Sequence, residues 1–150
     1  MKELRVTPIK KGTVIDHIPP GFALKVLHVL SIPEDTSSAV SIAMNVKSKM
    51  GKKDIVKIEN KELDKTEVNK ISLIAPNATI NIIRDFEVIK KDRVQLPNEI
   101  VGIVKCSNPT CISNSREPVD TRFILVSKNP PHIKCYYCER ETEDIAERII

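Results

Sequence analysis

The 150-residue sequence contains no tryptophan, two tyrosines and three phenylalanines, so aromatic side chains are scarce. Proteins that bind single-stranded nucleic acid stack bases on such rings, and their scarcity argues against that class. No apolar run approaches the ~20 residues of a membrane-spanning helix. The first residues also lack the apolar stretch of a secretory signal. We therefore expect a cytoplasmic protein that binds neither nucleic acid nor membranes.

Motifs for catalysis are missing as well. The sequence has neither the G-x-x-x-x-G-K-[ST] phosphate loop nor the G-x-G-x-x-G dinucleotide motif. No serine, cysteine or carboxylate pair is arranged as an activated nucleophile. Asp16 and His17 are neighbours in a predicted strand, where adjacent side chains point to opposite faces, so we do not expect an acid–base dyad. Nothing in the sequence therefore argues for an enzyme.

Charge and cysteine are distributed unevenly along the chain. Residues 1–97 carry 17 Lys/Arg against 12 Asp/Glu (net +5), whereas residues 98–150 carry 7 against 8 (net −1) and hold all four cysteines. Pro97 interrupts the strand pattern between the two parts. We predict two domains, 1–97 and 98–150. The first suits an anionic ligand and the second suits a metal.

The hydrophobic pattern of residues 1–97 predicts strand, helix, strand, strand, helix, strand, with extra strands at either end. The predicted helices cover residues 21–31 and 64–74, and the predicted strands cover residues 4–9, 12–18, 38–46, 54–59, 79–83 and 86–91. Asp64 and Glu67 match a capping box at the second helix. This order is typical of a ferredoxin-like α+β fold, in which two helices cover one face of an antiparallel sheet. The other face would be free for a ligand or a partner subunit.

Residues 98–150 predict a small all-β domain. Short strands are expected at residues 100–104, 122–126 and 133–136, and the tail 142–150 fits either a helix or an edge strand. A domain of this size buries too little apolar surface to be stable without a cross-link or a metal.

The four cysteines are spaced as C-x4-C, then 23 residues, then C-x2-C: Cys106, Cys111, Cys135 and Cys138. Two close pairs on separate turns can converge on one tetrahedral ion, and four thiolates select zinc or iron over magnesium or calcium. Two disulfides, a thioredoxin-like redox pair and a mononuclear iron site remain alternatives. We favour one structural zinc ion, whose closed coordination leaves no position for catalysis.

Lysines recur near the predicted strand ends in the first domain. Clusters of this kind neutralise phosphates, although lysines alone more often mark a solvated surface. The residues concerned are Lys52, Lys53, Lys57, Lys90 and Lys91.

Five segments are distinctive in combination: GTVIDHIP (12–19), GKKDIVKIEN (51–60), APNATINIIRDFEVIKK (75–91), CSNPTCISNSREPV (106–119) and CYYCE (135–139). Together they resemble the regulatory chains of aspartate carbamoyltransferase, in particular archaeal ones, over nearly the whole length. The resemblance implies a non-catalytic subunit in pyrimidine biosynthesis. Its first domain would bind CTP, ATP and also UTP as allosteric effectors and pair as a homodimer. Its second would be a zinc domain that contacts the catalytic chain.

The resemblance also assigns site residues. The nucleotide site would comprise Ile9, Asp16, His17, Lys53, Lys57, Asn81 and Lys91, and the four cysteines would bind the zinc ion. Lys90 would add charge near the same nucleotide site. Two other hypotheses stay open at this point. One is a zinc-ribbon protein that binds nucleic acid on a ferredoxin-like scaffold, and the other is a free-standing small-molecule sensor.

Overall fold

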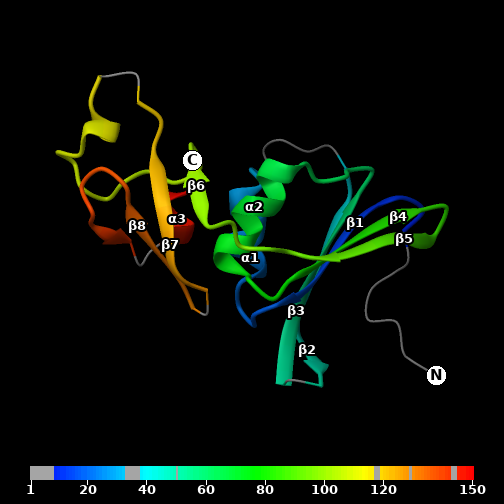
Figure 1. Ribbon diagram of the computed structural model, residues 1–150. Helices are drawn as coiled ribbons and strands as arrows, with labels where there is room; N and C mark the ends of the chain where they lie inside the picture. Colours follow the sequence, from blue (N-terminus) through cyan, green and yellow to red (C-terminus); the bar gives the residue numbers. More distant parts are fainter. Residues whose placement is uncertain (1–8, 33–37, 50, 117–118, 129, 143–144) are drawn as a thin grey trace.

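The computed structural model describes residues 9–32, 38–49, 51–116, 119–128, 130–142 and 145–150. The chain forms two lobes, each built on its own antiparallel sheet (Figure 1). The elements of the N-terminal lobe are β1 (Gly12–Ile18), α1 (Ala23–Val29), β2 (Val40–Ser48), β3 (Gly51–Glu59), α2 (Lys65–Ile74), β4 (Thr79–Arg84) and β5 (Glu87–Arg93). Those of the C-terminal lobe are β6 (Glu99–Val101), a 3-10 turn (Ile112–Asn114), β7 (Arg122–Lys128), β8 (Pro131–Cys135), β9 (Glu141–Thr142) and α3 (Ile145–Arg148).

The N-terminal sheet has the strand order β2-β3-β1-β4-β5, which confirms the ferredoxin-like prediction and adds β5 at one edge. Alternate residues such as Ile15, Val56 and Ile80 are buried against α1 and α2, so both helices lie on the same side of the sheet. The capping box is confirmed: Glu67 N donates to the Asp64 carboxylate at 2.8 Å, and Asp64 N donates back to Glu67 Oε1 at 3.1 Å.

The edge strand β2 differs from the simple alternation that its sequence suggests. Its pairing with β3 shifts register between Ala43 and Val46, so a bulge interrupts the strand. Ile42 and Met44 are 38% and 44% exposed instead of buried. The strand predicted for residues 4–9 falls, except for Ile9, outside the described residues.

The C-terminal lobe is all-β apart from short helical turns, with the strand order β6-β7-β8-β9. Its small core includes the fully buried Phe123 and Ile133 together with three of the cysteines. The tail combines both predicted conformations. Residues 145–148 form α3, and Ile149 then makes a β-bridge to Val104.

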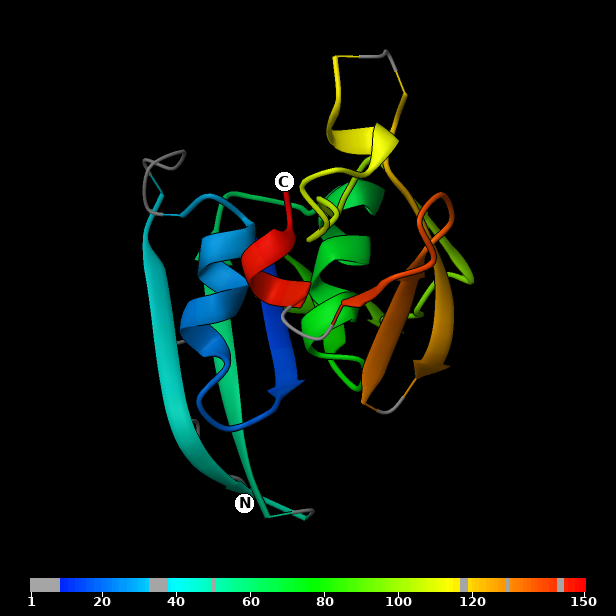
Figure 2. The same ribbon diagram turned by 90° about the vertical axis from the view of Figure 1, so that its left-hand side faces the viewer.

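The two lobes are in contact through this tail. Figure 2 shows α3 (red) between the N-terminal helices and the C-terminal sheet. Leu73 of α2 packs into the C-terminal core, Ile149 contacts both cores, and Lys70 Nζ donates to the Ile150 carbonyl at 2.8 Å. Within the described residues, no helix is both long and apolar enough to cross a membrane.

Candidate metal centre and ligand-binding face

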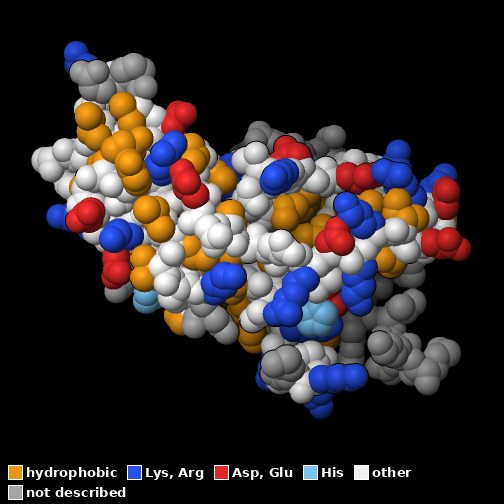
Figure 3. All heavy atoms as spheres, in the orientation of Figure 1, with side chains coloured by type: hydrophobic (Ala, Val, Ile, Leu, Met, Phe, Trp, Pro, Cys, Tyr) orange, Lys and Arg blue, Asp and Glu red, His pale blue; other side chains and the backbone are white. Residues whose placement is uncertain are grey.

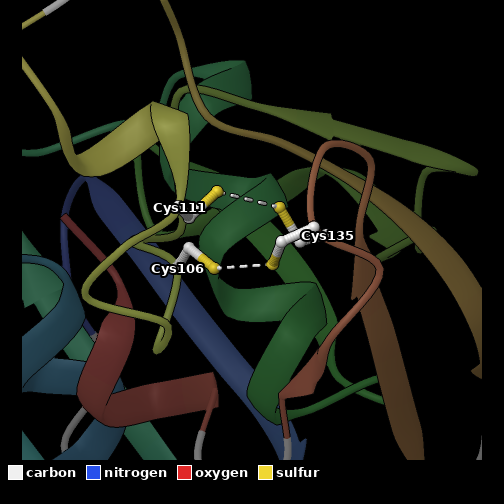
Figure 4. A group of neighbouring side chains, drawn as sticks. Cys106, Cys111 and Cys135 are labelled. Carbon is white, nitrogen blue, oxygen red and sulfur yellow. Dashed lines mark hydrogen bonds between the residues drawn. The ribbon is translucent and has the colours of Figure 1, made fainter.

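The four cysteine sulfurs converge at one end of the C-terminal sheet, all within 4.8 Å of one another. Cys106 and Cys111 lie on the loop after β6, and their side chains point toward Cys135 at the end of β8 (Figure 4). Cys106 Sγ is 3.6 Å from Cys138 Sγ, and Cys111 Sγ is 3.7 Å from Cys135 Sγ. Four sulfurs at about 2.3 Å from a tetrahedral zinc ion stand about 3.8 Å apart. The separations therefore fit one Zn²⁺.

Disulfides do not account for this cluster. All four cysteines are free, and the sulfur separations far exceed the ~2.05 Å of an S–S bond. The spacing-based prediction of one structural metal site is thus supported, and the two-disulfide alternative is wrong.

Polar groups around the cluster hold the first cysteine loop in shape. Asn108 N lies 3.5 Å from Cys106 Sγ, which is the backbone donation that stabilises a thiolate. Asn114 Nδ2 donates to the carbonyls of Cys106 at 2.9 Å and Asn108 at 2.7 Å. The sequence analysis missed Asn114. Its only sequence signal is its position three residues after Cys111.

The thiols differ in how their surroundings treat a negative charge. Burial alone would raise the pKa of Cys138, but donation from Arg140 N–H, Asn108 and the neighbouring thiols lowers this pKa to about 7. Burial raises the pKa of Cys106 to about 12, against the opposing effect of the Asn108 N–H. A divalent cation favours the thiolate form of every ligand, so the cluster as a whole is suited to a metal and not to a single reactive thiol.

The face of the N-terminal sheet opposite α1 and α2, here called the open face, carries a row of residues that crosses all five strands and is polar except at Val14. The cross-strand pairs run Ser41–Lys57, Lys57–Val14, Val14–Asn81 and Asn81–Lys91. Residues paired directly across antiparallel strands have side chains on the same face. Three of the residues assigned by resemblance (Lys57, Asn81 and Lys91) therefore share one row.

Lys57 is the most unusual member of this row. Its side chain is 2% exposed, yet its Nζ has no hydrogen-bond partner among the described residues. Burial lowers the pKa of Lys57, with a smaller opposing effect from Glu59. Buried ammonium groups are normally paired, so an unpaired one is a sign that an anionic partner belongs beside it.

Asp16 lies further along the same face, and His17 joins it there because β1 bulges at this point. The register with β3 shifts between Ile15 and Ile18, and His17 has a φ of 60°. Asp16 pairs with Lys53 (Nζ–Oδ1 2.9 Å). His17 Nδ1 lies 3.1 Å from the hydroxyl of Thr79, the residue directly opposite Asp16. The expectation that the two side chains point to opposite faces is therefore wrong, because strict alternation does not survive a bulge.

Ile9 lies at the other end of the open face. A Cβ added to Gly12 would come within 3.0 Å of Ile9 Cδ1 and would overlap the Ile58 carbonyl. Gly12, with a φ of 144° and no side chain, leaves room for Ile9 at this close approach. Six of the seven residues assigned by resemblance thus lie on one face, with the Asp16 pair at one end of β1, and the apolar Ile9 lies beside Gly12 at the other end of that strand.

The structure also corrects and extends this assignment. Lys90 pairs across from Ile82, which packs on the helix side, and it forms an ion pair with Asp92 at 3.3 Å. It therefore adds no charge to the open face. Two residues that the sequence analysis missed do lie there: Thr79 and, opposite it, Arg93. Thr79 is two residues before Asn81 in β4, and Arg93 is two residues after Lys91 in β5. Residues two apart in a strand share a face, which is the signal that could have found them.

The fold and the two sites define a two-domain α+β protein with a structural metal lobe and a separate polar sheet face. A family model described as the aspartate carbamoyltransferase regulatory chain, allosteric domain, matches residues 4–95, and one described as its metal binding domain matches residues 98–147. The chain therefore belongs to the family of aspartate carbamoyltransferase regulatory chains.

Curated relatives agree along the full length. The regulatory chain of Methanothrix thermoacetophila is 54% identical, covering 99% of this chain and 98% of the relative. That of Thermococcus sibiricus is 57% identical (96% and 95%), and that of Thermoplasma acidophilum is 52% identical (93% and 93%). Membership favours a regulatory subunit of an enzyme complex over the nucleic-acid-binding alternative, and it implies a catalytic chain as partner.

Proposed function

We propose that the open face binds the nucleotide effectors CTP and ATP, with UTP as a further effector, and that the chain relays this binding to the catalytic chain. The observation that carries the proposal is Lys57, a buried ammonium group in the cross-strand row that has no hydrogen-bond partner among the described residues. A nucleoside triphosphate is a polyanion that would supply the missing charge. No other group among the described residues combines such burial with an unpaired cation.

We assign each side chain of the open face a contact with one part of the nucleotide according to its chemistry. Lys53, Lys57 and Lys91 offset phosphate charge, and Asn81 offers its amide, which now donates to the Val14 carbonyl at 3.2 Å. Asp16 accepts hydrogen bonds from ribose hydroxyls or from an exocyclic amine. Ile9 provides an apolar surface for the base, and neighbouring backbone groups read its edge.

We further propose that two chains pair through β2. This strand is at the edge of the sheet, so the hydrogen-bonding groups on its outer side face away from the other strands. Its Ile42 and Met44 expose apolar surface that a second copy would cover. An edge strand with these properties favours a continuous sheet across a two-fold axis.

The C-terminal lobe is proposed to dock on the catalytic chain through the outer face of its sheet. Phe123 and Ile133 point to the core, whereas Val101 and Ile124 are 44% and 41% exposed on the other face, and Val126, at a bulge of β7, is 51% exposed. Hydrophobic side chains are exposed on the side of this lobe seen in Figure 3. Zinc makes the lobe rigid enough to transmit a difference in effector binding, for which a coupling of about 1–3 kcal/mol suffices.

Calorimetric titration of CTP and of ATP into the zinc-loaded full-length chain tests the effector site. Lys57→Ala is expected to weaken binding ~10-fold or more, because it removes a charge-assisted contact. Lys91→Ala should act in the same direction. Lys90→Ala is the matched control, since Lys90 is the next residue of β5 but lies on the opposite face. Unchanged affinity in both Lys57→Ala and Lys91→Ala, or an equal loss in Lys90→Ala, would contradict the assignment.

A further inference from the structure

Both neighbours of β3 carry a bulge at the same level of the sheet. The β1 bulge falls between Ile15 and Ile18, and the β2 bulge falls between Ala43 and Val46. Each bulge contains a non-glycine residue in the left-handed region, His17 and Asn45, both with a φ of 60°. Backbone of this kind is strained and persists only where surrounding contacts hold it in place. The β1 bulge belongs to the proposed effector site, and the β2 bulge to the proposed dimer edge.

Asp54 of β3 lies between these bulges, and its side chain is fully buried on the helix side of the sheet. Its Oδ1 accepts from Asn45 N at 2.9 Å, at the β2 bulge. Its Oδ2 accepts from Gly21 N at 2.9 Å and from Ala23 N at 3.1 Å, at the start of α1. Helix α1 has no side-chain cap of its own, so Asp54 supplies the acceptor that a capping residue would give. One carboxylate therefore joins three segments that are separate in the sequence.

The residue next to Asp54 in β3 is Lys53, whose Nζ pairs with Asp16 on the open face. Successive residues of a strand point to opposite faces, so a ligand at Lys53 and the buried contacts of Asp54 act on the same short piece of backbone. Asp54 is also paired with Ile18, immediately after the β1 bulge. The backbone of Lys53 pairs with Val46 just after the β2 bulge, whereas the Asp54 side chain contacts Asn45 inside the bulge.

We propose that Asp54 is a positioning residue that connects the effector site to the β2 edge, so that nucleotide capture at Lys53 changes the stability of the β2 bulge and of the start of α1. The inference rests on the proposed nucleotide binding at the open face. A carboxylate suits the task because both oxygens accept, and three backbone donors use them. An asparagine of the same shape keeps one acceptor oxygen and places an amide donor against a backbone N–H.

Hydrogen–deuterium exchange of the zinc-loaded full-length chain, with and without saturating CTP, tests the connection. In the wild type, CTP is expected to slow exchange of residues 40–48 and 21–26 by ~3-fold or more, in addition to its effect on β4 and β5. In Asp54→Asn, CTP should still bind by calorimetry and still protect β4 and β5. The response of residues 40–48 should be lost. A merely structural role would change basal exchange but not this selective response.

Two matched variants control the experiment. Asp92→Asn makes the same chemical change at an exposed carboxylate of the same lobe and should leave the response intact. Asn45→Gly keeps the N–H donor and tolerates a φ of 60°, so it should also respond. If Asp54→Asn does not fold, Asp54→Ser replaces it, because a hydroxyl still accepts one backbone N–H.

The outcomes separate this inference from the proposed function. Absence of CTP binding to the wild type would refute the effector site itself, and the role of Asp54 with it. CTP binding without any response of residues 40–48 in the wild type would overturn the role of Asp54 alone. A full response in the Asp54 variant would overturn it equally.

Discussion

Lys53 and Asp16 form an ion pair that joins β3 to β1 beside the bulge at His17, with 2.9 Å between Nζ and Oδ1. Both side chains remain partly accessible, at 19% and 24%, so the pair contributes at most about 1 kcal/mol to folding. Its larger consequence concerns ligands. Asp16 neutralises the Lys53 charge, so a phosphate at the proposed effector site would have to compete with a carboxylate already in place.

Removing that carboxylate is expected to separate affinity for phosphate from recognition of the nucleoside. Asp16→Ala should bind inorganic tripolyphosphate ~3- to 10-fold more tightly, because it frees Lys53 and removes a nearby negative charge. The same variant should discriminate less between CTP and tripolyphosphate, since the acceptor for the ribose or amine is gone. Calorimetry with both ligands measures the two effects. Glu87→Ala changes net charge equally at an exposed position of β5 and should alter neither.

The lowered pKa of Lys57 predicts that effector binding is accompanied by proton uptake. Burial lowers its pKa, so in the free protein the charged form is disfavoured, whereas a bound triphosphate favours it and raises the pKa again. Between these two pKa values, binding must take up a proton. Nucleotide affinity should therefore fall as pH rises through this window, approaching ~10-fold per pH unit at its steepest.

Titrations in buffers of different ionisation enthalpy count the protons taken up. Lys57→Arg should abolish the uptake, because arginine stays charged throughout this range. The lowered pKa of Lys57 also predicts that the folding stability of the free protein increases with pH over the same range. A folded-state pKa lowered below 10.5 destabilises the free protein at lower pH, and the penalty fades as pH rises towards 10.5. Lys57→Met should therefore stabilise the free chain at neutral pH while it weakens nucleotide binding, and a destabilised Lys57→Met would argue against an unpaired buried charge.

Metal removal should unfold one lobe and not the other. The C-terminal core is small and incorporates Cys106, Cys111 and Cys135, so the metal replaces much of the missing hydrophobic stabilisation. Zinc binding at such sites contributes on the order of 10–16 kcal/mol. Chelation, or Cys111→Ser, should abolish exchange protection of β7 and β8 and prevent association with the catalytic chain. The five-stranded sheet should stay protected, and a protected β7 in verified metal-free protein would contradict the structural role.

The fold and the metal site were accessible from the sequence because each rests on a local pattern. Short hydrophobic segments bounded by turn residues mark β1 and β3, the Asp64–Glu67 capping box marks α2, and the cysteine spacing marks two converging turns. The details that shape the open face could not be predicted in this way. A bulge such as that at His17 breaks the alternation on which strand prediction depends, and histidine is only a weak signal for a positive φ.

The role of Asp54 could not be predicted from the sequence for a different reason. In the sequence it is one charge beside two lysines, Lys52 and Lys53, and nothing local distinguishes it from a solvated surface residue. Its burial and its three backbone partners come from residues 9, 31 and 33 positions away along the chain. Only the assembled fold brings those donors to one carboxylate, so its role had to be found in three dimensions.

The exposed apolar side chains of β2 predict a dimer that a single charge can break. Met44→Lys should shift the chain towards monomer by ~10-fold or more in dissociation constant, because it places an ammonium group in an apolar contact. Sedimentation equilibrium of the zinc-loaded chain measures this shift. Val88→Lys, at a comparably exposed position on the opposite edge strand β5, is the control. Equal weakening by both variants would place the interface elsewhere.

The outer face of the C-terminal sheet should be separable from the effector site by mutation. Val126 is 51% exposed and points away from the core, so Val126→Glu is expected to leave folding, bound zinc and CTP affinity unchanged. In complex with the catalytic chain, however, the carboxylate would be buried without a partner, which should weaken association ~10-fold or more. Size-exclusion of the mixed chains, with titration of CTP into the isolated variant, measures both properties. Lys128→Glu, two residues further along β7, adds the same acidic side chain at the strand end and should have a smaller effect if the apolar centre of the face forms the contact. Full assembly of Val126→Glu with the catalytic chain would show that a different surface of the lobe is used.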